Sequence, residues 1–305
     1  MNIAITGANG FIGRYLCQHY YSSTDREVLA ITRPGRHIPV KTRTAALDYH
    51  TLSTWSDTLG GTDVLIHLAG IAHTTNTEPS DYYRINVDQT LEIARAAARS
   101  GVKQFIFFSS IKVNGEYTDK KPFSCNDQPN PKGHYATSKW RAEQGLAELS
   151  AGSDMAITII RPPLVYGETP KGNLRLIELA LHRGIPLPLK GIANKRDLVS
   201  LDNLANMLDH CLLNPACYGK TLLVSDGRPV STTDIVLQLA AAGGDTPRLF
   251  ACPRPLLSLI RHTPRLAAIY RKLFGNLEVD IRETVTVTGW QPSPAPEKTI
   301  TAQLA

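Results

Sequence analysis

Residues 2–13 read NIAITGANGFIG, an apolar run that passes through a glycine-rich turn into a second apolar segment. The first part, Asn2 to Thr6, is typical of a short β-strand. From Phe11 to Tyr21 the apolar residues recur at the spacing of one helix face. A strand that enters a helix through a tight glycine turn is the first unit of a parallel α/β sheet, and the stretch therefore predicts that fold class.

The glycines of this turn suit a dinucleotide-binding site. They permit a tight turn, a close approach of the backbone to a pyrophosphate, and close packing of the helix on the strand. The N-terminus of the helix also offers unpaired amide groups to phosphates. The residues assigned to this part of the cofactor site are Gly7, Asn9, Gly10, Phe11, Ile12 and Gly13.

Further strands and helices alternate along the first half of the chain. The apolar runs that predict strands are Val28 to Thr32, Val64 to Leu68, Phe105 to Ser109 and Ala156 to Arg161. Helical stretches lie between them, such as Asp88 to Arg99 and Ser138 to Ser150. This alternation predicts a doubly wound parallel sheet of the Rossmann type with right-handed crossovers.

After Arg161 the pattern loosens, because prolines interrupt the chain and leave only short helical candidates such as Leu174 to Arg183. We therefore predict a dinucleotide-binding domain over residues 1–165 and a smaller lobe, mainly for substrate, over residues 166–305. Residues 220–225 predict a strand that returns to the main sheet, which makes the lobe discontinuous.

The end of the second predicted strand bears on the choice of cofactor. An acidic residue there would accept hydrogen bonds from the ribose of NAD, but residues 30–36 contain no carboxylate. Arg33 and Arg36 are instead placed to meet a 2'-phosphate, which favours NADP(H) and leaves NAD(H) open. Asp48, farther on, is a candidate for binding the adenine amino group.

Tyr135 and Lys139 are four residues apart, which places a phenol and an ammonium group on one face of a helix. A cation near a phenol stabilises the phenolate and brings proton transfer within reach at neutral pH. Lys139 is also a candidate for holding the nicotinamide ribose. Ser110 follows an apolar strand whose carboxyl end borders the predicted crevice, and it completes a predicted catalytic set.

Composition excludes several other classes of protein. The 305 residues are 42% hydrophobic and 20% charged, as in a globular protein. The net charge of +6 is scattered without a basic run, which favours an anionic small substrate over nucleic acid.

The five cysteines show neither metal-ligand spacing nor a disulfide framework, and we expect free thiols and no metal. No leader and no apolar run of about 18 residues is present, and we expect a cytoplasmic location.

Taken together, the motifs resemble those of the extended short-chain dehydrogenases/reductases, a family of nucleotide-sugar epimerases, dehydratases and 4-keto reductases. The resembling segments are residues 6–13, 67–70, 82–87, 108–110, Tyr135 with Lys139, and 161–167. The resemblance implies that Asn86 supports the active-site helix and the nicotinamide region and that Ala69 and Gly70 line the cofactor. The cofactor site predicted from these segments also includes Leu68, Asn86, Ser109, Tyr135, Lys139 and Pro162. A homodimer that associates through the helix of Tyr135 is a further expectation from the family.

The resemblance is compatible with two of the family's reactions, a 4-keto reduction and a 4-epimerisation. Dehydratases of the family carry Thr-Asp-Glu where this chain has Ser110-Ile111-Lys112, and the two carboxylates that eliminate water are absent. A reductase would deliver hydride from NADPH to a 4-keto sugar, whereas a 4-epimerase would oxidise and re-reduce one carbon with retained NAD. An exchangeable NADP(H) favours the reductase. A cofactor-binding regulator without catalysis is a remote third hypothesis, because Tyr135 and Lys139 are both intact.

Closer resemblance, over residues 109–116 and 198–203, is to bacterial polysaccharide-locus proteins that reduce UDP-4-keto-6-deoxy-N-acetylglucosamine to UDP-N-acetylquinovosamine. Lys112 would bind substrate, act as an acid, or remain a solvated lysine. The resemblance implies that Asn173 and Arg196 contact the nucleotide diphosphate. Residues 253–276 mix apolar and basic residues; we expect them to cap the lobe, with peripheral membrane contact through residues 254–275 as the alternative.

Overall fold

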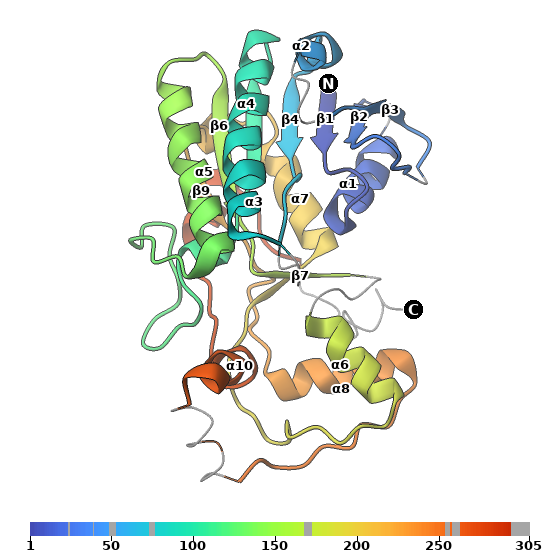
Figure 1. Cartoon of the computed structure of the whole chain (residues 1–305), viewed down its shortest axis with the longest axis vertical. Helices are drawn as coiled ribbons and strands as arrows, with labels where there is room; N and C mark the ends of the chain where they lie inside the picture. Colours follow the sequence, from blue (N-terminus) through green and yellow to red (C-terminus); the bar gives the residue numbers. More distant parts are fainter. Residues whose placement is uncertain are drawn as a thin grey trace.

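The computed structural model describes residues 1–23, 25–38, 40–48, 53–72, 77–167, 173–253, 257 and 263–293. Its main sheet has seven parallel strands in the order β3-β2-β1-β4-β5-β6-β9 (Figure 1). These strands are β1 (Asn2–Thr6), β2 (Glu27–Thr32), β3 (Arg43–Ala46), β4 (Val64–His67), β5 (Gln104–Phe108), β6 (Ala156–Arg161) and β9 (Thr221–Leu223). The order runs outward from β1 in one direction and from β4 in the other, which confirms the doubly wound fold.

Helices cover both faces of the sheet. One face packs against α1 (Phe11–Tyr21), α7 (Leu201–Cys211) and the segment around α11 (Arg282–Thr288). The other face packs against α2 (Ser53–Leu59), α4 (Thr90–Arg99) and α5 (Gly133–Ala151). Ile66 belongs to the first core and Leu65 to the second, because neighbouring strand residues point to opposite faces. All four residues of β4 are buried, as expected for a strand between two helical layers.

The smaller part of the molecule lies below the sheet in Figure 1. A two-stranded parallel sheet of β7 (Leu164–Tyr166) and β8 (Leu198–Ser200) lies at its junction with the main sheet. Below it, α6 (Asn173–His182), α8 (Thr232–Gly243) and α10 (Pro264–Phe274) surround a separate apolar core. Leu273 and Phe274 of α10 pack against that core, as expected for a segment that caps the lobe. Residues 254–256 and 258–262 of the same basic segment lie outside the described residues.

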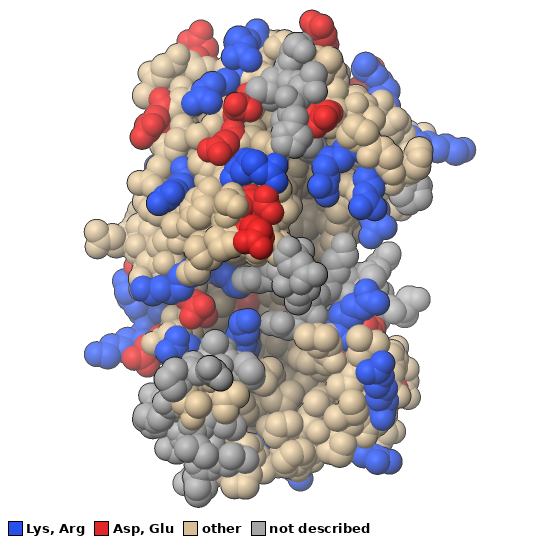
Figure 2. All heavy atoms as spheres, viewed as in Figure 1, with Lys and Arg blue, Asp and Glu red and all other residues tan. Residues whose placement is uncertain are grey.

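Four short helices complete the described elements. They are α3 (Pro79–Tyr83), the π-helix η1 (Arg84–Gln89), and the 3-10 helices η2 (Ile111–Val113) and η3 (Pro215–Cys217). Within the described ranges, none of the helices combines the length and apolar character needed to cross a bilayer. Figure 2 shows Lys and Arg mixed with Asp and Glu over the sheet layer, in agreement with the scattered charges of the sequence.

Several predicted bounds differ from the structure. The expected return to the sheet occurs as β9, which pairs with β6. The α5 helix begins at Gly133, ahead of the predicted Ser138, so that Tyr135 is inside it. The β8 strand ends at Ser200, whose hydroxyl caps α7 by accepting from the Asn203 amide at 3.1 Å. The division of the chain at residue 165 stays a prediction, and α7 and α11 pack on the sheet although they follow it.

Candidate active site

Two adjoining cavities lie beyond the carboxyl ends of β1 and β4, where the winding of the sheet reverses. Their volumes are about 430 Å³ and about 280 Å³. The residues that line both are Gly7, Gly10, Leu68, Gly70 and Ile71. Ligands of doubly wound sheets bind at this reversal, and small-molecule sites typically measure about 300–1,000 Å³. The two cavities together form a crevice of suitable size for a dinucleotide and part of a substrate.

The glycine turn fits a dinucleotide because its backbone has no space for side chains. Gly7 has a φ of 66°, and a methyl group on it would lie 2.8 Å from the Ala69 backbone nitrogen. A methyl group on Gly13 would lie 2.4 Å from the Gly7 carbonyl oxygen. The N-cap of α1 is Gly10, which has no side chain to occupy the amide groups of the first turn. The residues of this first turn line the smaller cavity, which a pyrophosphate could enter.

Gly13→Ala is expected to lower the unfolding free energy by about 1–3 kcal/mol and to weaken cofactor binding, because the added methyl group meets a fixed carbonyl. A glycine-to-alanine change within an unobstructed helix would instead stabilise by about 0.5–1 kcal/mol. The measurements are chemical denaturation and titration with NADPH and NADH. Gly152→Ala is the control, since its nearest neighbour lies 3.9 Å away. If the two variants were equally stable, the packing argument would be wrong.

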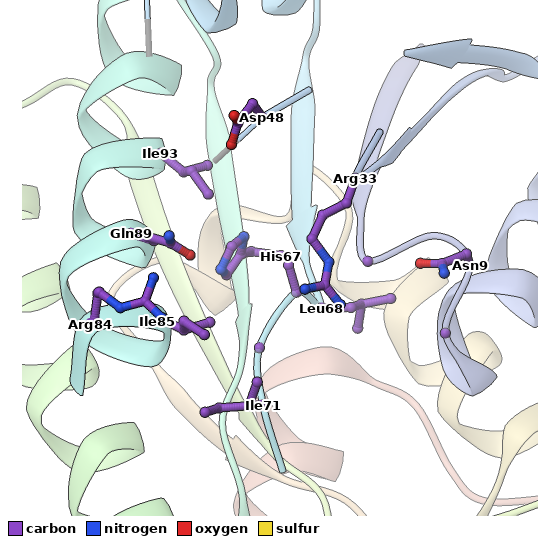
Figure 3. A pocket seen from close by; sticks show the side chains of 14 residues that line it. Asn9, Arg33, Asp48, His67, Leu68, Ile71, Arg84, Ile85, Gln89 and Ile93 are labelled. Carbon is purple, nitrogen blue, oxygen red and sulfur yellow. The ribbon is translucent and has the colours of Figure 1, made fainter. Parts of the chain in front are cut away.

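The larger cavity contains the residues predicted for the adenosine end of the cofactor. Figure 3 shows Arg33 and Asp48 on the side of β2 and β3, and Asn9 in the turn that leads into α1. Arg36 does not line this cavity; it is exposed, and its backbone amide donates to the Arg33 carbonyl at 3.2 Å. The structure thus brings together three of the four predicted polar residues. Arg33 lines the cavity, whereas Arg36, three residues later, is not among the lining residues.

Sequence reasoning missed the opposite wall of this cavity. Figure 3 shows Arg84, Ile85, Gln89 and Ile93 extending from η1 and α4. Arg84 and Ile85 belong to the recognised segment 82–87, and Gln89 and Ile93 follow it, but no helical periodicity predicts which residues of a π-helix face inward. The only signal in the sequence is the neighbouring Asn86 motif itself.

His67 forms the floor of the larger cavity. Its Nδ1 lies 2.9 Å from the Thr6 hydroxyl and its Nε2 lies 3.1 Å from the Thr90 hydroxyl. Burial, with a smaller contribution from the Lys139 charge, lowers the pKa of His67 to about 3. The imidazole is therefore neutral at physiological pH and joins β1, β4 and α4 beneath the crevice.

The smaller cavity contains the predicted catalytic set, defined as Ser110, Tyr135 and Lys139, and is also lined by Ser109 and Pro162. Burial raises the pKa of Tyr135, whereas a hydrogen bond with the Ser110 side chain lowers it. Burial lowers the pKa of Lys139 to about 8, and the Glu143 charge opposes this effect. The three side chains thus lie together at the carboxyl end of β5 and the start of α5.

Lys139 lies against two segments, β5 and the stretch that follows β4. Its ammonium nitrogen donates to the Phe108 carbonyl at 2.8 Å and lies 4.6 Å from the centroid of the Phe107 ring. A methyl group on Gly70 would lie 3.4 Å from that nitrogen and 2.9 Å from the Asn86 Oδ1. The segment after β4 therefore approaches the Asn86 side chain too closely for a side chain at Gly70, and it lies in ordinary contact distance of the lysine.

Asn86 lies behind the catalytic set and does not line either cavity. Its Oδ1 accepts from the Ile71 amide at 2.9 Å, and its Nδ2 donates to the Ile71 carbonyl at 3.0 Å and to the Ser138 hydroxyl at 3.0 Å. The side chain is buried. It joins the segment after β4 to α5, so the structure places Asn86 behind the cofactor site and not among the residues that line it.

A buried polar network underlies the same region, and sequence reasoning missed most of it. The Ser109 hydroxyl donates to the Glu143 carboxylate, which also accepts from Arg161 Nε at 2.9 Å and from Nη2 at 2.5 Å. Arg161 Nη1 donates to the Asn114 Oδ1 at 2.9 Å. The spacing of Glu143 four residues after Lys139 on α5 was the available signal. The network connects the ends of β5 and β6 to the active-site helix.

The predicted substrate residues are separated. The ammonium nitrogen of Lys112 lies 5.8 Å from the centroid of the Tyr135 ring. Arg196 Nη1 donates to the Gly275 carbonyl at 2.9 Å in the lobe. Asn173 is the first residue of α6, and its side chain is outside the described structure. Among these residues, Lys112 alone is observed beside the catalytic set.

The fold and the crevice define a dinucleotide-binding protein of the extended short-chain dehydrogenase/reductase class. The chain belongs to the NAD dependent epimerase/dehydratase family, whose model matches residues 3–221. It is 35% identical to a UDP-glucose 4-epimerase of Vibrio cholerae over 95% of this chain and 90% of that protein. It is 28% identical to the Escherichia coli O157:H7 N-acetyl-alpha-D-glucosaminyl-diphospho-ditrans,octacis-undecaprenol 4-epimerase, over 70% of this chain and 64% of that protein.

Solved structures share the fold at lower identity. A UDP-glucuronic acid 4-epimerase from Bacillus cereus in complex with NAD superposes with a TM-score of 0.79 and 19% identity, over 100% of this chain and 97% of that chain. MoeE5 in complex with UDP-glucuronic acid and NAD gives a TM-score of 0.80 and 22% identity, over 100% and 98%. The match of the family model and the Vibrio cholerae relative confirm the family expected from the sequence.

Proposed function

We propose that this chain transfers a hydride at carbon 4 of a UDP-linked sugar, and that its net reaction is the NADPH-dependent reduction of a 4-keto sugar. UDP-4-keto-6-deoxy-N-acetylglucosamine, which would give UDP-N-acetylquinovosamine, is the proposed substrate. The observation that carries the proposal is the grouping of Ser110, Tyr135 and Lys139 in the cavity next to the glycine turn. The second candidate is a UDP-hexose 4-epimerase with retained NAD, which the Vibrio cholerae relative favours.

Each residue of the catalytic set has a distinct role in this chemistry. A bound nicotinamide supplies or accepts the hydride. The Tyr135 hydroxyl gives its proton to the sugar 4-oxygen during reduction and takes that proton back during oxidation. The Ser110 hydroxyl orients the tyrosine, in agreement with its hydrogen bond to that side chain. Lys139 places a positive charge beside the negative charge that develops on the tyrosine oxygen.

The proposed preference for NADP(H) rests on Arg33. Arg33→Ala is expected to weaken NADPH binding by about 1.5–3 kcal/mol, because a charged hydrogen bond to the 2'-phosphate is lost. NADH binding should change little. Calorimetric titration of both cofactors measures the difference. Arg36→Ala is the matched control, because this nearby arginine lies outside the cavity. Equal losses for NADPH and NADH in Arg33→Ala would remove the basis for the preference.

The decisive experiment follows nicotinamide absorbance with the purified chain and UDP-4-keto-6-deoxy-N-acetylglucosamine. Stoichiometric consumption of cofactor, faster with NADPH than with NADH, is the expected result. Interconversion of UDP-glucose and UDP-galactose, or of their N-acetylated forms, without added cofactor would instead establish the epimerase. Cofactor binding without turnover of any of these sugars would return the non-catalytic regulator to consideration.

Three further features belong to the proposal. Asn173 and Arg196 bind the nucleotide diphosphate, for which the forked donors of an arginine are suited. The protein works as a homodimer in the cytoplasm, in bacterial surface-polysaccharide synthesis such as that of O-antigen, as the family resemblance implies. Peripheral membrane contact through residues 254–275 is the weaker alternative to the capping role, because Leu273 and Phe274 pack inward.

A further inference from the structure

Lys112 is the charged residue closest in sequence to the catalytic serine, and nothing in the proposed reaction uses it. It lies on η2, directly after the carboxyl end of β5, where ligands of such sheets bind. Its ammonium nitrogen is 5.8 Å from the centroid of the Tyr135 ring, and the residue is half-buried. Lys139 occupies the inner side of the same region, bonded to the Phe108 carbonyl. The tyrosine therefore has two lysines near it, and they come from different elements.

The C-terminal end of α10 lies against the segment that carries Lys112. Arg271 Nη1 is 3.5 Å from the Glu116 carboxylate, and its guanidinium carbon is 5.4 Å from the centroid of the Tyr117 ring. The Thr118 amide donates to the Asn276 carbonyl at 2.9 Å. These contacts join a helix of the lobe to the loop that follows the catalytic serine.

The charges around Lys112 come from both sides of this contact. Burial lowers the pKa of Lys112 to about 8, and the positive charge of Lys272 on α10 lowers it further in the same direction, while Glu116 opposes them. The cation–π contact with Tyr135 contributes only about 0.5–1 kcal/mol at such a site. An oxygen with partial negative charge placed near Lys112 would offset the repulsion between its charge and that of Lys272. A sugar held at Tyr135 presents several such oxygens.

We propose that Lys112 donates a hydrogen bond to a sugar oxygen of the bound substrate beside the one served by Tyr135, and that α10 controls the charge of this lysine through Lys272. The inference rests on the proposed function, since it requires a nucleotide sugar in the crevice. It makes Lys112 a residue that recognises the sugar rather than the diphosphate. It also gives the lobe a direct influence on the catalytic set.

Competitive acetylation of the full chain, read by peptide mass spectrometry, tests both parts. The amine reacts only in its neutral form, so the pH dependence of the Lys112 rate reports its charge. UDP-glucose at about ten times its Kd should slow acetylation of Lys112 about tenfold, because only unliganded protein reacts. UDP alone should leave the rate unchanged, and the exposed Lys190 should be unaffected by either. Calorimetry on the same samples verifies that both ligands bind.

Two variants at Lys272 test the influence of α10. Lys272→Gln should move the midpoint of Lys112 acetylation to higher pH, whereas Lys272→Arg, which keeps the charge, should leave it unchanged. An unmoved midpoint in Lys272→Gln overturns the role of α10. Binding of UDP-glucose without protection of Lys112, or equal protection by UDP, overturns the sugar contact. No binding of UDP-glucose or UDP would instead contradict the proposed function itself.

Discussion

Tyr135→Phe is expected to lower kcat by about 10²- to 10⁴-fold, because the variant loses the proton donor and keeps the ring. The ring packs against Tyr82 at 6.5 Å between centroids and needs no hydroxyl for that contact. Cofactor binding should be retained, since the glycine turn and Lys139 are unchanged. Steady-state kinetics with the keto sugar, or with UDP-glucose for the epimerase, measures the loss.

Tyr83→Phe provides a control from the same neighbourhood. Its hydroxyl lies 3.3 Å from His134 Nδ1 at an exposed position, and its loss should leave kcat unchanged. A Tyr135→Phe variant as active as Tyr83→Phe would show that another group moves the proton. That result would remove the catalytic role of the tyrosine and leave the cofactor site intact.

Glu143→Gln is expected to lower the free energy of unfolding by about 3–5 kcal/mol, because the charge of Arg161 would remain buried without a carboxylate. The side chains of this pair are only 2% and 4% exposed. The substitution preserves shape, so that lost packing does not contribute. Urea denaturation of the variant and the parent chain measures the difference.

The control is an ion pair at the surface. Asp280→Asn breaks the contact with Arg282, whose side chain is 90% exposed, and such pairs contribute about 0–1 kcal/mol. Comparable losses in Glu143→Gln and Asp280→Asn would mean that the buried network does not stabilise the end of β5. That result would also mean that the hydrogen bond from the Ser109 hydroxyl to the Glu143 carboxylate adds little to stability.

Local signals in the sequence were sufficient to predict the sheet and the grouping of the predicted catalytic set. The residues of the glycine turn and Tyr135 with Lys139 are each close together in sequence, and their conformations are set by short-range sterics and helix spacing. Ser110 could be placed with them because parallel strands bring their carboxyl ends to one edge. The structure agrees with this placement.

Contacts between distant segments were not predictable in the same way. Glu143 and Arg161 meet only because α5 lies over β6, and no spacing in the sequence encodes that distance. Which residues of η1 face the cavity depends on its π-helical turn. This turn ends at Gln89, so that it overlaps only the start of the helix predicted for residues 88–99. Arg36 was assigned with Arg33, but only Arg33 of the two lines the cavity.

The late return of the chain to the main sheet has a consequence for synthesis on the ribosome. The outer edge of β6 is paired by β9 at residues 221–223, and the fully buried Trp290 joins the core on the α1 and α7 face of the sheet. A nascent chain that ends near residue 165 leaves an open strand edge and an uncovered apolar face, both of which promote association with other chains. The nucleotide-binding half can therefore finish folding only after most of the polypeptide has been translated. Until then its open strand edge and apolar face must be kept from contact with other chains.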